Sequence, residues 1–231
     1  MVKQLGWMAG EFSHFPRYTK SNIDRVILLD GFENFAAGKE RGKGVLFLTG
    51  HVSAWELAPL AQALYGNPLH FLIRPIDNPR VDALITEYRC LSGNRTIEKN
   101  QSVRAVLKAL GENGAVGILA DQNTQPAEGV FVDFFGIPAC TTTGLARFAL
   151  HTGAAVVPVF VHWDEAIRKY RLCFEPEVKV QHSGDTDADI LENTQRFTRV
   201  IENRVRRFPD EWLWVHRRWK VRPPGEPPIY K

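Results

Sequence analysis

The most constraining feature of this sequence is a series of short apolar runs that alternate with segments of helical spacing. Residues 45–49, 115–120 and 154–161 are rich in Val, Ile, Leu and Ala, and they read as buried strands. Residues 53–65 and 79–91 carry apolar side chains at the spacing of helices. Alternation at this spacing favours a mostly parallel sheet with helices on its faces.

Further elements continue the pattern. The remaining predicted strands are 69–73, 129–136 and 170–180, and the remaining helices are 102–110, 141–153 with a cap at Thr141 or Thr142, and 190–207. A composition of 44% hydrophobic and 24% charged residues is that of a globular protein. Because no repeat or linker divides the chain, we predict one α/β domain over residues 40–231. We expect residues 1–39 to be an N-terminal segment that contacts a membrane, packs on the domain or is part of a truncated anchor.

Charge is unevenly distributed along the chain. The formal net charge is +3, but the stretch 196–222 holds nine basic residues against three acidic ones. The basic residues are Arg196, Arg199, Arg204, Arg206, Arg207, Arg217, Arg218, Lys220 and Arg222. Such a basic end suits an anionic partner, such as a phosphate, a lipid surface or an acidic protein, and it equally suits a solvated basic face.

Several classes of protein are disfavoured. The cysteines Cys90, Cys140 and Cys173 are far apart and form no CxxC pair, so we predict reduced thiols without a disulfide framework or a zinc site. No apolar run approaches the roughly 20 residues that span a bilayer, and no signal peptide is visible. No H-E-x-x-H motif or other ligand cluster indicates a metal.

Polar side chains follow three of the predicted strands at the point where each ends. His51 follows the first strand, Arg74 the second, and Asp121 and Gln122 the third. Ligands of such sheets bind outside the carboxyl ends of the strands. The sequence therefore places its candidate site at this edge.

His51 and Glu56 are the candidate reaction centre. Five positions along one helix would separate their side chains by about 140°, but a histidine in the turn and a glutamate at the start of the helix can converge. The carboxylate would fix the tautomer and leave the other nitrogen as a base, and helix-start amides would hold an oxyanion. The alternative is a structural histidine beside a capping-type glutamate. His182 and Asp187 repeat the spacing in a polar turn and read as surface loop.

The base has no obvious partner nucleophile in the chain. No serine stands in a G-x-S-x-G elbow, and no cysteine stands in a suggestive place, so an acyl-enzyme hydrolase is unsupported. We infer that the substrate brings its own nucleophile, a hydroxyl or an amine.

The sequence resembles the lysophospholipid acyltransferase superfamily, and within it the lipid A biosynthesis (lauroyl/myristoyl, late) acyltransferases. The superfamily signature His-x4-Asp/Glu is matched by His51 and Glu56 in "GHVSAWE". The other matching blocks, in family order, are "RPIDNP" (74–79), the aspartate of "ILADQ" (118–122), "GVFVDFFG" (129–136), "ACTTTG" (139–144), "VVPVF" (156–160) and "WLWVHRRWKVRPPG" (212–225). The N-terminal membrane-anchoring helix that family members commonly carry is not recognisable here.

The resemblance implies a glycerolipid acyltransferase-like fold and an O-acyltransferase without metal or dissociable cofactor. It implies transfer of a fatty acyl group from an acyl carrier protein thioester, or from acyl-CoA, to a hydroxyl of a lipid A precursor. The location implied is the cytoplasmic face of the bacterial inner membrane, and we expect peripheral attachment to its anionic surface.

Roles for individual residues follow from the resemblance and from their positions. His51 would deprotonate the acceptor hydroxyl, and Glu56 would orient and stabilise the imidazole. Arg74 would bind an acceptor phosphate or pair with Asp77, and Asp121 would form a strand-end turn or a supporting hydrogen bond. The predicted substrate-binding set is Arg74, Asp77, Asn78, Asp121, Gln122, Gly136, Arg217 and Arg218.

Three other functions are weighed. The acceptor could instead be another lysolipid, such as a lysophosphatidate or an amino-acid-containing lipid. A catalytically silent lipid-binding protein of the same fold is disfavoured by the intact His51 and Glu56. A nucleic-acid binder built on the basic C-terminus is disfavoured because Trp212, Trp214 and Trp219 alternate with apolar residues in the manner of packing residues.

Overall fold

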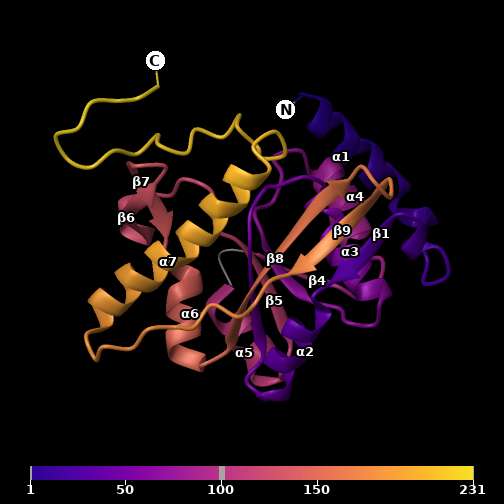
Figure 1. Ribbon diagram of the computed structural model, residues 1–231, viewed down its shortest axis with the longest axis horizontal. Coiled ribbons are helices and arrows are strands. Elements are labelled where there is room, and N and C mark those ends of the chain that lie inside the picture. The colour runs from indigo at the N-terminus through magenta and orange to yellow at the C-terminus, as the bar shows by residue number, and fades with distance from the viewer. Residues whose placement is uncertain (1, 99–101, 231) are drawn as a thin grey trace.

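A seven-stranded, mostly parallel sheet forms the centre of the protein in a computed structural model that describes residues 2–98 and 102–230 (Figure 1). The strand order is β1-β9-β8-β2-β5-β3-β4. The strands are β1 (Ile27–Asp30), β2 (Val45–Thr49), β3 (His70–Ile73), β4 (Arg95–Glu98), β5 (Ala115–Leu119), β8 (Ala155–Asp164) and β9 (Lys169–Phe174). Neighbouring strands from β8 to β4 pair in parallel, whereas β9 runs antiparallel to β8 and β1 runs parallel to β9. The predicted α/β fold is confirmed.

Helices cover both faces of the sheet. Figure 1 shows α5 (Ser102–Gly111), α6 (Gly144–Thr152) and α7 (Thr186–Arg207) on one side, with α1 (Val2–His14), α2 (Phe32–Glu40), α3 (Leu57–Leu64) and α4 (Pro79–Cys90) on the other. Two apolar cores result. Val106, Phe148 and Ile201 belong to the first core, whereas Phe35 and Leu60 belong to the second. The alternating pattern of the sequence therefore corresponds to a three-layer architecture.

Most predicted elements are present, but several differ at their boundaries, among them the helix predicted over 190–207, which begins at Thr186. The helix predicted from residue 53 begins at Leu57, because Ser53 adopts a positive φ of 55° and the chain forms a turn first. The helix predicted from residue 141 begins at Gly144 after Thr143, because Thr141 and Thr142 end strand β7 (Ile137–Thr142). The strand predicted over 170–180 ends at Phe174.

The N-terminal segment contributes to the central sheet. Strand β1 forms its edge beside β9, and Phe35 of α2 is buried in the second core. Phe12 of α1 stacks on Tyr88 with ring centroids 5.5 Å apart, and the Trp7 and Trp163 rings lie 6.1 Å apart. Helix α1, strand β1 and helix α2 therefore pack on the same domain as the rest of the described chain. No helix among residues 2–98 and 102–230 has both the length and the apolar character needed to cross a bilayer.

A hairpin and the C-terminal segment complete the structure. Strands β6 (Gly129–Phe134) and β7 pair antiparallel as a separate two-stranded sheet. After α7 the chain crosses to the carboxyl end of β2, where Trp212 forms an antiparallel bridge with Val52 and the Leu213 amide donates to the His51 carbonyl at 3.0 Å. The C-terminal block is therefore anchored beside the candidate site.

Candidate active site

The site is built on the turn that follows β2. A Cβ atom at Gly50 would lie 3.1 Å from the Asp121 side chain, so a residue without a side chain allows the two strand ends to approach closely. The Ala120 amide, just after β5, donates to the Thr49 carbonyl at 3.0 Å. Neighbouring parallel strands thus bring His51 and Asp121 together although they are seventy positions apart.

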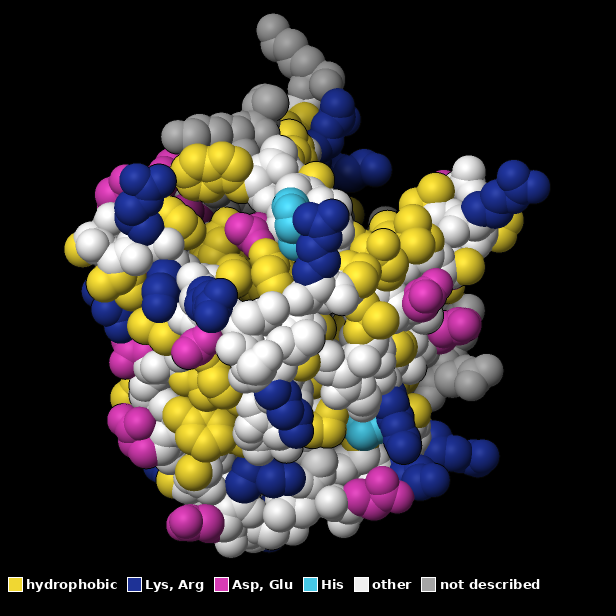
Figure 2. All heavy atoms as spheres, turned by 90° about the vertical axis from the view of Figure 1, so that its right-hand side faces the viewer, with side chains coloured by type: hydrophobic (Ala, Val, Ile, Leu, Met, Phe, Trp, Pro, Cys, Tyr) yellow, Lys and Arg dark blue, Asp and Glu magenta, His cyan; other side chains and the backbone are white. Residues whose placement is uncertain are grey.

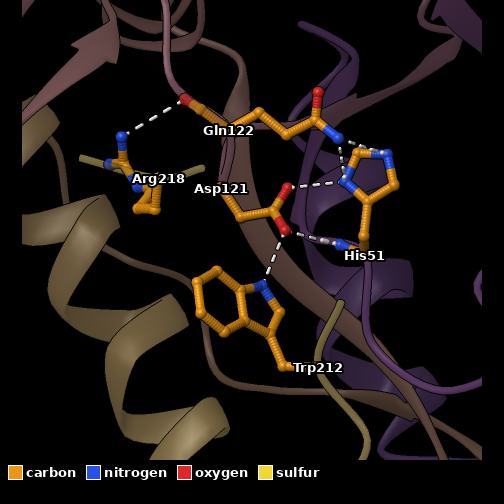
Figure 3. Close-up of polar contacts among 5 residues, drawn as sticks. All are labelled: His51, Asp121, Gln122, Trp212 and Arg218. Atoms are coloured by element: carbon orange, nitrogen blue, oxygen red, sulfur yellow. Dashed lines mark hydrogen bonds and ion pairs between the residues drawn. The ribbon is translucent and has the colours of Figure 1, made fainter. Parts of the chain in front are cut away.

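Asp121 fixes His51 through two contacts (Figure 3). Its Oδ1 lies 2.8 Å from His51 Nδ1, and its Oδ2 accepts from the His51 backbone N–H at 2.9 Å. The Trp212 indole N–H also donates to Oδ2, at 2.9 Å. Because the carboxylate accepts at Nδ1, that nitrogen carries the proton and Nε2 is left as the basic atom.

Asp121 is ionised in this setting. The side chain is almost fully buried, and burial alone would raise its pKa, but the His51 charge and the hydrogen bonds from His51 and Trp212 outweigh burial and lower the pKa to about 2. A buried carboxylate that accepts three hydrogen bonds is a fixed negative charge beside the imidazole. It can stabilise an imidazolium that forms during a reaction.

Glu56 is held by Arg89. The Arg89 Nε and Nη2 atoms lie 3.0 Å and 2.5 Å from the two Glu56 carboxylate oxygens. Burial would lower the pKa of Arg89, but the hydrogen bonds and charge of Glu56 reverse this and raise it. The structure thus differs from our expectation that Glu56 orients His51. Glu56 stands just before α3 and turns towards α4, whereas Asp121 ends the strand next to β2.

Gln122 lies over the imidazole. Its Nε2 atom is 3.3 Å from both ring nitrogens of His51 (Figure 3). The Gln122 carbonyl accepts from the fully buried Arg218, which also bonds the Cys140 carbonyl and the Thr141 hydroxyl. Burial lowers the pKa of Arg218 to about 10. Arg218 therefore positions the backbone beneath Gln122 and is not exposed to solvent.

A cavity of about 520 Å³ opens beside His51 and continues over the sheet. His51, Glu56, Arg74, Arg89 and Gln122 contribute polar groups to it. Its apolar lining includes Phe47, Trp55, Ala58, Pro59, Leu69, Phe71, Leu72, Ile73, Ile118, Leu119 and Val159. A polar mouth joined to an apolar interior suits a molecule with a reactive polar group and a hydrocarbon part.

The "RPIDNP" residues have separate roles. Arg74 is exposed and lines the cavity, and no ion pair joins it to Asp77 within the described chain. Asn78 caps α4, because its side-chain oxygen accepts from the amides of Arg80 and Val81 at 3.0 Å and 3.3 Å. The predicted alternative of an Arg74–Asp77 pair is therefore not formed in the structure.

Of the predicted substrate-binding residues, Arg74 and Gln122 line the cavity, whereas Asp77, Asn78, Asp121, Gly136, Arg217 and Arg218 are not part of its wall. Gly136 occupies the β6–β7 turn with a φ of 78°, and its amide donates to Asp133 at 3.0 Å. Arg217 is exposed, with its guanidinium 6.0 Å from the centre of the Tyr230 ring. Their roles in substrate binding stay predictions.

Sequence reasoning missed two residues that hold the site. Arg89 reads as an ordinary charged residue of an amphipathic helix, and only the packing of α4 beside α3 brings it to Glu56. Trp212 was expected to pack, and it does so with only 2% of its surface exposed, but its N–H also bonds Asp121. The N–H group of a buried tryptophan usually finds a hydrogen-bond acceptor, so the predicted burial of Trp212 already indicated that an acceptor lies beside it.

The fold and the site together place a histidine, held by a buried carboxylate, in the wall of a largely apolar cavity at the carboxyl edge of an α/β sheet. The family model for the bacterial lipid A biosynthesis acyltransferases matches residues 1–221, and this chain belongs to that family. It is accordingly an O-acyltransferase by family, as the resemblance predicted.

Characterised relatives agree with this placement. The chain is similar to the lipid A biosynthesis palmitoleoyltransferase of Escherichia coli (strain K12), with 28% identity over 211 residues that cover 91% of this chain and 67% of that protein. It is 29% identical over 202 residues to the lauroyltransferase of the same organism, covering 87% and 64% of the two chains. The corresponding myristoyltransferase is 24% identical over 201 residues, covering 87% and 61%. The chain thus spans about two thirds of the length of these relatives.

Proposed function

We propose that this protein transfers a fatty acyl group from an acyl thioester to a hydroxyl of a lipid A precursor. The observation that carries the proposal is the His51–Asp121 contact at the mouth of the apolar cavity, in a chain of this family. Acyl carrier protein is the proposed donor carrier, and acyl-CoA is the alternative. The relatives are named for the transfer of different acyl groups, so they support acyl transfer as the reaction and do not indicate which acyl group this protein uses.

In the proposed mechanism His51 acts as a general base. Nε2 takes the proton of the acceptor hydroxyl while that oxygen attacks the thioester carbonyl carbon. The resulting tetrahedral intermediate collapses, the carbon–sulfur bond breaks, and the imidazolium returns the proton to the departing thiolate. Asp121 holds Nδ1–H and stabilises the imidazolium, and no acyl-enzyme intermediate is required.

Three groups are proposed to stabilise the oxyanion of the intermediate. The Gln122 amide nitrogen lies 3.3 Å from the base nitrogen, the turn before α3 contributes Trp55 and Glu56 to the same cavity and offers its backbone amides, and Arg89 brings a positive charge to the cavity wall. Glu56 then acts by holding Arg89 in place through its bidentate contact. Glu56 stays a predicted catalytic residue, but through Arg89 rather than through the His51 tautomer.

Product analysis tests the proposed function. The protein is incubated with acyl carrier protein thioesters, with acyl-CoA, and with a panel of acceptors that includes a lipid A precursor, lysophosphatidate and an amino-acid lipid. Mass spectrometry should show an added acyl chain on the lipid A precursor. Acylation of lysophosphatidate alone would move the protein to the alternative acceptor class, and no acylation of any acceptor would refute the transfer proposal.

Arg74 is proposed to bind an acceptor phosphate. It lines the cavity, is exposed, and has no acidic partner among the described residues. Because lysine cannot reproduce a bidentate guanidinium contact worth roughly 1.5–3 kcal/mol, we expect Arg74→Lys to lower the acceptor kcat/KM by about 10- to 150-fold. Slow thioester hydrolysis by water should be unaffected. Parallel loss of both activities together with a lower Tm would mean that Arg74 supports the fold.

We propose peripheral attachment at the cytoplasmic face of the inner membrane. Of the basic C-terminal residues, Arg199, Arg206, Arg207, Arg217 and Lys220 are exposed, whereas Arg204 and Arg218 are buried. Trp7 is 40% exposed, and the face in Figure 2 carries hydrophobic, basic and acidic side chains intermixed. We expect sedimentation with anionic vesicles that weakens as salt is raised, because exposed cations attract anionic lipids. Equal binding to neutral vesicles at every salt concentration would exclude the electrostatic contribution.

A further inference from the structure

One polar side chain lies in the apolar part of the cavity without a partner. Gln62 of α3 lines the cavity and is only 1% exposed, and its amide nitrogen has no hydrogen-bond partner among the described residues. A buried amide without a partner is unfavourable, so such a group in a ligand cavity indicates a polar atom in the ligand.

Gln62 lies deep in the cavity relative to His51. The cavity wall includes Thr49 and Phe47 on β2, residues 117–119 on β5 and residues 71–73 on β3, which are three neighbouring strands. Phe47 and Phe71 belong to the same apolar core as Leu60 of α3, so α3 covers this part of the sheet. Gln62 lies six residues beyond Glu56, which corresponds to about 9 Å along a helix.

Gly117 provides the space opposite α3. It pairs with Phe47 on one neighbouring strand and with Phe71 on the other. A Cβ atom at this position would meet Leu69 at 3.5 Å and Phe71 at 3.6 Å, which is ordinary contact. A methyl group therefore fits at this position of the cavity wall without displacing its neighbours.

We propose that Gln62 selects acyl chains that carry a hydroxyl near the middle of the chain. This inference rests on the proposed function, since the ligand is taken to be the acyl group of the donor. With the thioester at His51, a chain that enters the cavity reaches Gln62 several carbons beyond its carbonyl. A hydroxyl both donates and accepts, so it satisfies either end of the Gln62 amide. An unsubstituted chain would leave that amide buried and unpaired.

The experiment compares acyl thioesters of one chain length. The chains are unsubstituted, hydroxylated at successive mid-chain carbons, hydroxylated next to the thioester, or cis-unsaturated at mid-chain. We expect one mid-chain hydroxyl position to raise the donor kcat/KM of the natural protein by about 5- to 10-fold over the unsubstituted chain, the size of one buried neutral hydrogen bond. In Gln62→Met the unsubstituted chain should become the better donor.

Gly117→Ala is the matched control. It adds one methyl group to the same part of the cavity without changing a polar group. The donor kcat/KM values of the hydroxylated and unsubstituted acyl chains should therefore change by the same factor, and the ratio of these two values should stay unchanged. The proposal would be overturned if the natural protein showed equal kcat/KM values for the hydroxylated and the unsubstituted acyl chain. It would also be overturned if Gln62→Met kept the natural protein's ratio of these two values. Preference for the cis-unsaturated chain over the hydroxylated one would show selection by shape and would overturn it too.

Equilibrium binding separates this inference from the proposed function. The free fatty acids, unsubstituted and hydroxylated at mid-chain, are titrated against the natural protein and both variants, with displacement of a fluorescent fatty acid as the readout. A preference for the hydroxylated acid that Gln62→Met abolishes supports the role of Gln62 even if no acyl transfer is found. No preference in binding, together with normal transfer, would refute the role of Gln62 and leave the acyltransferase proposal intact.

Discussion

Replacing His51 with alanine should lower acyl transfer by 10²- to 10⁴-fold, the usual effect of losing a general base. The imidazole is the group whose Nε2 is left basic by Asp121, and it stands in the cavity wall rather than in either apolar core. Asp121 would keep its hydrogen bonds from the His51 backbone and from Trp212. The Tm should therefore change little. The measurement is transfer rate and thermal unfolding on one preparation of His51→Ala.

His151→Ala is the control for this substitution. His151 is an exposed residue near the end of α6, far along the chain from the turn after β2, and its replacement should leave transfer unchanged. A folded His51→Ala protein with turnover close to that of the natural protein would exclude the base mechanism. A large fall in Tm would instead assign His51 a structural role.

The sheet was predictable because its strands are buried on both faces. The parallel strands β2, β5 and β8 lie in the middle of the sheet, so each reads as a continuous apolar run. Strands β1 and β4 lie at the edges, and neither was predicted: each has only four residues, and β4 is mostly polar. Edge strands are only partly buried, so short segments of this kind lack the long apolar run that marks a central strand.

The location of the site was predictable, but its hydrogen bonds were not. Parallel strands end at one edge, so His51, Arg74 and Gln122 were expected near one another, and the cavity brings them together. The local spacing of His51 and Glu56 suggested a direct contact. Strand pairing instead brings Asp121 to the imidazole, and helix packing brings Arg89 to Glu56. Contacts of this kind depend on register between distant segments, which local patterns do not contain.

Replacing Asp121 with asparagine should lower transfer by about 10²- to 10⁴-fold without removing the side chain's volume. An amide cannot accept at both oxygen positions. Its N–H₂ group would face either Nδ1 of His51 or the backbone and indole N–H donors that now bond Oδ2. If the amide donates to Nδ1, the proton moves to Nε2 and the imidazole can no longer act as a base, as happens when the aspartate of a hydrolase triad is replaced by asparagine.

Acid unfolding gives an independent measure of the same carboxylate. The pKa of Asp121 is about 2 in the folded protein against an ordinary value of 3.8, so the folded state binds the proton more weakly than the unfolded state. The stabilisation from this group is complete above pH 4 and is lost as the pH falls from about 4 to about 2. Asp121→Asn should therefore remove one titrating group from the pH dependence of unfolding in that window.

Trp212→Phe keeps the Asp121 carboxylate and removes one hydrogen-bond donor to it. This variant should reduce the pKa shift of Asp121 and lower the transfer rate by less than Asp121→Asn does. Transfer by Asp121→Asn within a few-fold of the natural rate would show that Asp121 only holds the turn, and that another group sets the tautomer of His51.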